Sequence, residues 1–264
     1  MIIVGEKINA SIPAVKKIIE SRDQEGLCSL ARKQVDAGAQ YIDVNVATGI
    51  GDQETEIEAM EWAINVLQDE IETPLCIDSA DPFVIEAGLK ARGNRKSLIN
   101  STNNEKERLE KVVPLAVEYD SPLIALVMGE QGIPQTEGER IEIAAEMVGF
   151  MEKSGLKLDQ VYFDPLVIPI STDNTQALVT LNTLSRLKNE FPSASTVMGL
   201  SNVSYGLPGR SALNAGFMIM AMLKGLDAAV MDPLDQGLMN SVKIANALLG
   251  RDRYCRRYLR AFRK

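Results

Sequence analysis

Short runs of apolar, β-branched residues recur along the chain, and longer segments with helical periodicity separate them. The runs are apolar on both faces instead of alternating, which is typical of buried parallel strands. Successive runs begin about 32 residues apart, the length of one strand–helix unit. The eight predicted strands are Ile2–Val4, Tyr41–Val46, Leu75–Asp78, Ser97–Asn100, Leu123–Met128, Val161–Asp164, Thr196–Ser201 and Ala228–Asp232.

The segments between these runs carry apolar residues at helical spacing, and several begin at recognisable capping residues. Asp81-Pro82 has the sequence of an N-cap followed by proline at the first helical position. Thr102 with Glu105, and Thr136 with Glu139, have the spacing of a capping box. The predicted helices are Gln24–Gly38, Glu54–Glu70, Pro82–Lys90, Glu105–Tyr119, Glu137–Ser154, Asn174–Phe191, Ser211–Lys224 and Leu238–Leu249.

Eight strands with a helix after the last one predict an α/β fold, a closed (β/α)8 TIM barrel. Such a barrel typically needs about 250 residues, and this chain has 264. No low-complexity linker interrupts the rhythm, so residues 1–264 are predicted to form a single domain. A doubly wound open sheet is the competing architecture, but no GxGxxG motif follows the first strand.

The composition is that of a globular protein, with 45% hydrophobic and 24% charged residues. The chain contains no histidine, which excludes a Ser-His-Asp triad, histidine metal ligands and imidazole acid–base chemistry. Its three cysteines are far apart and lack metal-ligand spacing, so reduced thiols are expected. The amino terminus lacks an export signal and no apolar run approaches 18 residues, so a cytoplasmic protein without a membrane span is expected.

The net charge of −8 is unevenly distributed. Residues 251–264 carry seven basic side chains and one acidic one, which leaves a charge of −14 on the rest of the chain. A body this acidic argues against a broad nucleic-acid surface. The tail is predicted to be a basic helix that is either solvated, packed on the body, or in contact with an acidic partner.

Carboxylate, amide or hydroxyl side chains end seven of the eight predicted strands. In barrels of this kind the active site lies at the carboxyl ends of the strands, so these side chains should share one rim. Such residues also cap helices, but Asp78 and Asn100 each precede a separate cap candidate. The rim residues are Glu6, Asp43, Asn45, Asp78, Asn100, Asp164, Ser201, Asn202 and Asp232.

Two kinds of ligand fit this rim. A divalent metal could bind the hard oxygens of Asp43, Asp78, Asp164 and Asp232, although barrel metal sites usually include histidine or lysine as well, so no metal is predicted. The better match is a flat, amide-like heterocycle such as a pterin. A carboxylate can accept two parallel N–H donors of its edge, and an asparagine can supply one donor and one acceptor.

Six short motifs occur in a fixed order along the chain. They are GEKIN (Gly5–Asn9), YIDVN (Tyr41–Asn45), CIDS (Cys76–Ser79), INST around Asn100, FDPL (Phe163–Leu166) and GLSNVS (Gly199–Ser204). Together they resemble the methyltetrahydrofolate:corrinoid protein methyltransferases. These belong to the pterin-binding barrels, which also include dihydropteroate synthase and the folate domain of methionine synthase. The resemblance covers nearly the whole chain.

The resemblance implies that the pterin ring is held by the residues after strands three, four and six. Here these positions match Asp78, Asn100 and Asp164. The asparagine of the LSNVS segment matches Asn202, which is expected near the folate N5 atom. Asp78 and Asp164 are expected to serve the proton path as well as binding.

The remaining expected contacts surround the same pocket. The backbone around Gly199 and Ser201 would line it, and Glu6 and Asn45 are expected to contribute to substrate binding. Arg210 resembles a family arginine on the folate side.

The function implied is transfer of the N5-methyl group between methyltetrahydrofolate and a corrinoid carried by a partner protein. Without histidine, a hydrogen-bond network would assist protonation of N5. The resemblance also implies a homodimer. Two alternatives stay open: a non-catalytic folate-binding subunit of a corrinoid complex, and a pterin transferase of the dihydropteroate synthase type. Against the second alternative, this chain lacks the basic residues that dihydropteroate synthases carry after strands seven and eight.

Overall fold

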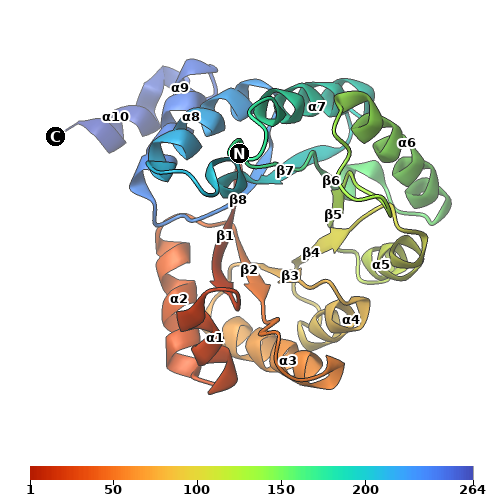
Figure 1. Cartoon of the computed structure of the whole chain (residues 1–264). Helices are drawn as coiled ribbons and strands as arrows, with labels where there is room; N and C mark the ends of the chain where they lie inside the picture. The colour runs from red at the N-terminus through yellow and green to blue at the C-terminus, as the bar shows by residue number, and fades with distance from the viewer. Residues whose placement is uncertain (264) are drawn as a thin grey trace.

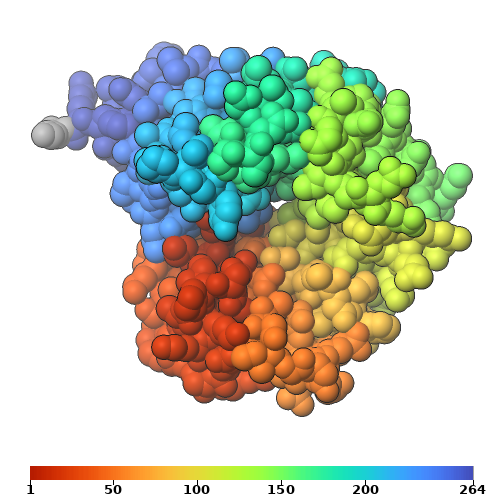
Figure 2. Space-filling model, viewed as in Figure 1, coloured from red at the N-terminus to blue at the C-terminus, as the bar shows by residue number. Residues whose placement is uncertain are grey.

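The protein is a closed barrel of eight parallel strands in chain order, surrounded by helices, in a computed structural model that describes residues 1–263 (Figure 1). The first strand pairs with the second and with the last, so that Ile2 lies opposite Ala228. Figure 2 accordingly shows the red start of the chain against its blue end. The strands are β1 (Ile2–Asn9), β2 (Tyr41–Asn45), β3 (Leu75–Asp78), β4 (Ser97–Thr102), β5 (Leu123–Leu126), β6 (Val161–Asp164), β7 (Ser195–Gly199) and β8 (Ala228–Met231).

The predicted barrel is therefore confirmed, and each of the eight helices predicted between and after the strands is present within two residues of its expected bounds. The α-helices are α1 (Pro13–Glu20), α2 (Gln24–Asp36), α3 (Gln53–Glu70), α4 (Pro82–Ala91), α5 (Lys106–Glu118), α6 (Glu137–Lys153), α7 (Gln176–Glu190), α8 (Arg210–Leu223), α9 (Gln236–Leu248) and α10 (Arg256–Phe262). Three short 3-10 helices join them: η1 (Leu158–Gln160), η2 (Leu200–Ser204) and η3 (Arg253–Cys255).

Two of the three predicted helix starts are confirmed. The Asp81 side chain accepts from the Phe83 N–H at the start of α4, and Thr136 with Glu139 forms a complete capping box at the start of α6. The predicted box at Thr102 is wrong. Thr102 is fully buried within β4, and Glu105 begins α5 without a side-chain capping bond.

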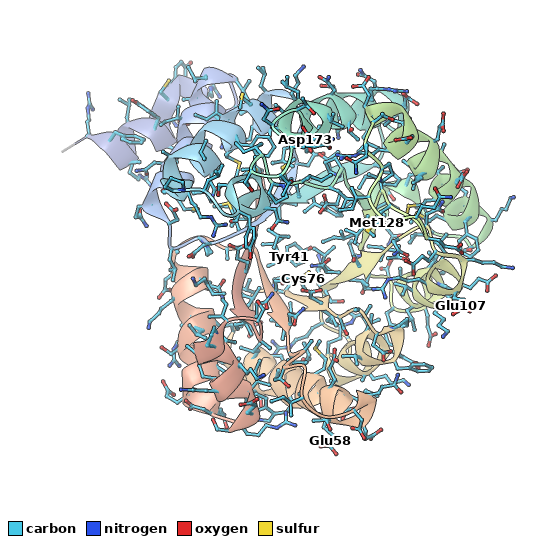
Figure 3. All side chains as sticks on the ribbon, in the orientation of Figure 1. Tyr41, Glu58, Cys76, Glu107, Met128 and Asp173 are labelled. Carbon is cyan, nitrogen blue, oxygen red and sulfur yellow. The ribbon has the colours of Figure 1, made fainter. Side chains whose placement is uncertain are left out.

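Alternate residues of each strand face the barrel interior and the surrounding helices. On β2, Ile42 and Val44 are fully buried beneath the helices, whereas Tyr41 packs inside the barrel against the cluster that contains Cys76. Figure 3 shows Tyr41 and Cys76 within the ring of strands and Glu58 and Glu107 on its outer side. This alternation brings Asp43 and Asn45 of β2, Asp78 of β3, Asn100 of β4 and Asp164 of β6 to the barrel mouth.

The basic tail forms η3 and α10, and none of the residues in these two helices is buried. Helix α10 lies beside α9 and projects away from the barrel (Figure 1). Leu259 and Phe262 keep 39% and 40% of their surface exposed, so the tail is a solvated helix rather than one packed into the body. Lys264 lies outside the described residues. Within residues 1–263, no helix has the length and apolar character needed to cross a membrane.

Candidate active site at the barrel mouth

The ends of β2, β3 and β4 bring four polar side chains into one hydrogen-bonded group. Asn45, Asp78 and Asn100 lie side by side in the strand register. The Asn45 amide donates to a carboxylate oxygen of Asp78 at 2.9 Å, and the Asn100 amide donates to Asp43 at 3.2 Å. Both amides are therefore oriented by carboxyl groups. The Asn45 side-chain oxygen already accepts from the Ala47 N–H at 3.1 Å, whereas the Asn100 side-chain oxygen can accept from a ligand.

Asp43 was not among the predicted binding residues, although it lies two positions before Asn45 and so faces the same side of β2. Its side chain is in hydrogen-bond contact with Asp78. Burial raises the pKa of Asp43 well above its ordinary value, and the negative charge of Asp78 raises it further. Burial also raises the pKa of Asp78, while bonds from Asn45 and Asp43 oppose the rise. Asp43 therefore keeps its proton and donates it to the Asp78 carboxylate.

Asp164 ends β6 on the other side of the mouth. Its carboxylate accepts from the backbone N–H of Leu166 at 2.7 Å and from the N–H of Gly199. Burial raises its pKa to about 7, against the lowering effect of these two bonds and of Arg140. Near neutral pH this group can thus either accept two donors as a carboxylate or give up a proton.

The segment after β7 turns at once into η2, which carries Ser201 and Asn202. A Cβ atom on Gly199 would lie 3.2 Å from the side-chain nitrogen of Asn202, so the asparagine folds back over the glycine. Asn202 itself is exposed. Its amide thus lies at the open mouth, next to the Gly199 N–H that binds Asp164.

Glu6 and Arg210 both contact this segment. The Ser201 hydroxyl donates to Glu6 at 3.2 Å. Arg210 donates to the Ser204 hydroxyl at 3.0 Å and to the Ser201 carbonyl at 2.8 Å. Burial raises the pKa of Glu6, and the nearby Asp232 raises it further, while Ser201 lowers it.

One residue of the mouth that the sequence did not single out as a site residue is Lys7. Its ammonium forms an ion pair with Asp232 at 3.0 Å and joins β1 to the end of β8. No signal in the sequence marked Lys7, because its partner is 225 positions away.

The predicted residues thus fall into three contact groups on one rim. Asn45, Asp78 and Asn100 form the first group with Asp43, Asp164 contacts Gly199 in the second, and the third is Glu6, Ser201 and Arg210, with Asn202 beside Gly199. Their oxygens and amide groups can bind the edges of a planar ring by hydrogen bonds. Among the described residues, no three histidine, cysteine or acidic side chains are grouped so as to hold a metal ion.

The family model described as pterin binding enzyme matches residues 8–232, most of the barrel. This chain belongs to the pterin-binding enzyme family. The match extends from the end of β1 to Asp232 and so includes nearly all of the rim.

Two proteins with similar sequences bear on the chemistry. A methylcorrinoid:tetrahydrofolate methyltransferase of Eubacterium limosum is 38% identical over 266 aligned residues, which cover 100% of this chain and 97% of that protein. A methionine synthase of Mycobacterium tuberculosis is 27% identical over 87% of this chain. The alignment spans only 20% of the methionine synthase.

Solved structures of dihydropteroate synthases share the fold of this family member. The enzyme of Stenotrophomonas maltophilia superposes with a TM-score of 0.70 at 18% identity and covers 86% of this chain and 88% of its own. That of Vibrio fischeri gives 0.71 at 17% identity, with 94% and 93% covered. At these identities the likeness establishes the barrel alone.

Proposed function

We propose that this protein transfers a methyl group between N5 of tetrahydrofolate and the cobalt of a corrinoid protein. The observation that carries the proposal is the full-length 38% identity to the Eubacterium limosum enzyme named for this chemistry. The acid and amide groups of the rim support it, because they suit the edge of a pterin ring. Because that relative is named for a methylcorrinoid and tetrahydrofolate, we expect this protein to act on a corrinoid, which we propose a partner protein carries.

The pterin would be held by its edges between Asp78, Asn100 and Asp164. A pterin offers neighbouring N–H donors at N3 and at the 2-amino group, and one carboxylate can accept both. Asp164 suits this role once it is ionised, since its pKa is about 7. Burial raises the pKa of Asp78, but the bonds from Asn45 and Asp43 favour its ionised form, and the fixed Asn100 amide turns its oxygen toward the ring.

The reaction needs a proton to move at N5. In the direction from folate to corrinoid, the N5–CH3 bond breaks, Co(I) supplies the electron pair of the new cobalt–carbon bond, and N5 takes up a proton. In the direction from methyl-Co(III) to folate, the N5 lone pair attacks the methyl carbon, cobalt leaves as Co(I), and N5 loses its proton.

We assign the hydrogen bond to N5 to Asn202, whose amide lies at the open mouth. A donor aimed at a developing charge stabilises the transition state more than the ground state. Asp78 and Asp164 would orient the ring and connect N5 to the solvent through protonated or water-linked groups. Glu6, Asn45 and the backbone of Gly199 and Ser201 would complete the pocket, with Arg210 on the folate side.

The test is an anaerobic assay with methyltetrahydrofolate and free cob(I)alamin, followed through the corrinoid spectrum. We expect the Co(I) band to give way to methyl-Co(III), and Asn202→Ala to lower turnover by roughly 10- to 1,000-fold. Asn246→Ala on α9 is the matched control, because that amide only bonds the Val242 carbonyl of its own helix. A loss below threefold in Asn202→Ala, with folate still bound, would remove Asn202 from the mechanism.

Two other outcomes would favour the alternatives. Tight folate binding without methyl transfer, to cobalamin or to any corrinoid protein, would favour a folate-binding subunit. Condensation of a hydroxymethylpterin pyrophosphate with p-aminobenzoate would favour a pterin transferase of the dihydropteroate synthase type.

A further inference from the structure

Arg140 is a buried cation in the first turns of α6, and it is fully shielded from solvent. Its guanidinium donates only to neutral oxygens. These acceptors are the Pro134 carbonyl at 3.0 Å, the Pro165 and Leu166 carbonyls at 2.8 and 3.0 Å, the Thr180 hydroxyl at 3.3 Å and the Gln176 amide oxygen at 2.9 Å. Arg140 therefore joins the start of α6 and the start of α7 to the segment that follows Asp164.

The charge of Arg140 is not neutralised by direct contact. Within the described residues it forms no ion pair within 4 Å, and burial lowers its pKa. The carboxylates that act on it through space are Asp164 and Glu139. Glu139 is already engaged in the capping box with Thr136, so Asp164 is the group left to balance the cation.

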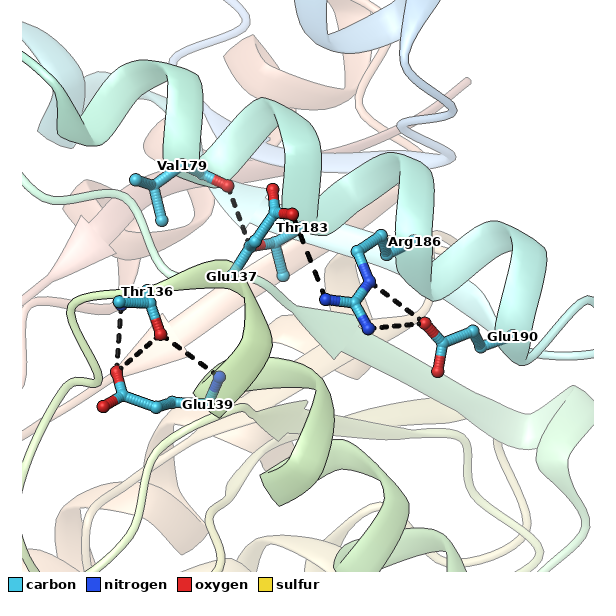
Figure 4. Close-up of polar contacts among 7 residues, drawn as sticks. All are labelled: Thr136, Glu137, Glu139, Val179, Thr183, Arg186 and Glu190. Atoms are coloured by element: carbon cyan, nitrogen blue, oxygen red, sulfur yellow. Dashed lines mark hydrogen bonds and ion pairs between the residues drawn. The ribbon is translucent and has the colours of Figure 1, made fainter.

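The position of Arg140 is fixed from both of the helices around it. The capping box lies one residue before it and anchors the first turn of α6, while Glu137 approaches Arg186 of α7 at 4.0 Å (Figure 4). Thr180 of α7 donates to the Leu166 carbonyl at 2.9 Å, the same carbonyl that Arg140 binds. Leu166 needs this support, because its φ of 65° is unfavourable for a residue with a side chain.

We propose that Arg140 is a positioning residue of the pterin site: it holds the backbone turn after Asp164 in place and supplies a positive charge that favours the carboxylate form of Asp164. The turn it binds contains the Leu166 N–H that donates to the Asp164 carboxylate. Its role in ligand binding rests on the proposed function, whereas its effect on Asp164 in the free protein does not.

Few other charges face Asp164. The neighbouring strands, β5 and β7, contain no titratable residue, and β6 itself carries only Tyr162 besides Asp164. The other carboxyl groups of the mouth are Glu6, Asp43, Asp78 and Asp232, of which none appears among the groups that shift the pKa of Asp164. Arg140 is the charged side chain that does shift it, so a change at Arg140 should be measurable.

The test places a compensating charge beside Arg140 without cutting its bonds. Gln176→Glu keeps an acceptor at 2.9 Å from the guanidinium but adds a negative charge, which pairs with Arg140 and weakens its field at Asp164. The matched control is Gln176→Met, which has a similar shape and removes the bond without adding charge. Arg140→Lys keeps the charge and removes most of the bonds to the turn.

The readout is the ionisation of Asp164 in the free protein, followed by carbon-13 NMR of labelled aspartate carboxyls and assigned with Asp164→Asn. We expect the pKa of Asp164 to rise by about 0.5 to 1 unit in Gln176→Glu and to stay within about 0.2 unit in Gln176→Met. Methyltetrahydrofolate affinity in Gln176→Glu should then fall about threefold at pH 7 and recover at pH 9. Arg140→Lys should lower folate affinity about tenfold with little change in the pKa of Asp164.

Each part of the proposal can be overturned. Identical Asp164 titrations in Gln176→Glu and Gln176→Met would refute the electrostatic role, and wild-type folate affinity in a folded Arg140→Lys protein would refute the tether. A shifted titration in Gln176→Glu, together with no folate binding by the wild-type protein, would instead refute the proposed function and leave the effect on Asp164 standing.

Discussion

Asp43 and Asp164 are both acids whose pKa is raised by burial, but their neighbours give them different roles. Asp43 lies beside the negative Asp78 and therefore stays neutral and donates. Asp164 receives two backbone N–H bonds and the field of Arg140, which hold its pKa to about 7. At the residue scale, the barrel mouth thus combines a hydrogen-bonded pair of carboxyl groups, Asp43 and Asp78, with a group that changes charge near neutral pH, Asp164.

The pH dependence of stability offers a test of the Asp164 environment. An unfolded aspartate titrates near pH 4, so the folded protein binds this proton more tightly than the unfolded chain. The stabilisation is complete below about pH 4 and is lost as the pH rises through about 7. Asp164→Asn has no carboxyl group to titrate at this position, so it does not lose this stabilisation. Relative to wild type, the free energy of unfolding of Asp164→Asn should therefore increase by on the order of 2 kcal/mol between pH 5 and pH 8.5.

Urea unfolding at both pH values measures this gain. Asp173→Asn is the control, because the pKa of Asp173 is lowered by hydrogen bonds from Thr175 instead of raised. A stability difference between Asp164→Asn and wild type that is independent of pH would contradict a raised pKa.

At the scale of elements, the sequence predicted the order of strands and helices because burial on both strand faces leaves a strong apolar signal. It missed α1, which is only eight residues long, begins shortly after the polar end of β1 and contains two buried side chains, Val15 and Ile19. It assigned a cap to Thr102 because spacing cannot tell that the strand continues to that residue. The strand ends also predicted which side chains reach the mouth, but not which of them pair, since pairing depends on neighbours distant in sequence.

The junction between β7 and η2 is an element-scale feature with a clear test. Gly199→Ala would place a methyl group 3.2 Å from the Asn202 amide nitrogen and displace that side chain. The backbone φ of Gly199, −73°, suits alanine, so the fold should persist. We expect methyl-transfer turnover to fall about tenfold while folate affinity changes less than threefold.

Steady-state and binding measurements on the same preparation distinguish these effects. Gly149→Ala in α6 is the control, because a Cβ there meets nothing within 4 Å. Equal turnover in Gly199→Ala and wild type would show that the position of Asn202 does not matter.

At the scale of the whole molecule, the barrel and its basic tail are separable in packing. Helix α10 buries no residue, whereas α9 beside it buries five. The tail also carries charge opposite to that of the body, whose sequence is strongly acidic. Its structure therefore suits a surface segment more than a part of the core.

Removal of residues 256–264 tests that separation. We expect the melting temperature to change by less than about 2 °C and methyl transfer to free cobalamin to stay within twofold of wild type, because little apolar surface is lost. Leu238→Ala, in the buried face of α9, should lower the melting temperature by several degrees and serves as the reference. A drop of more than about 5 °C on truncation would show that α10 stabilises the barrel.

The pairing of β1 with β8 affects when the ligand site forms during synthesis of the chain. Lys7 meets Asp232, and Glu6 meets Ser201, across 225 and 195 positions of the chain. While the ribosome is still making the last strand, β1 has one unpaired edge and the mouth lacks one wall. The ligand site is therefore among the last features that a newly made chain acquires, and loop closure on this scale favours slow folding.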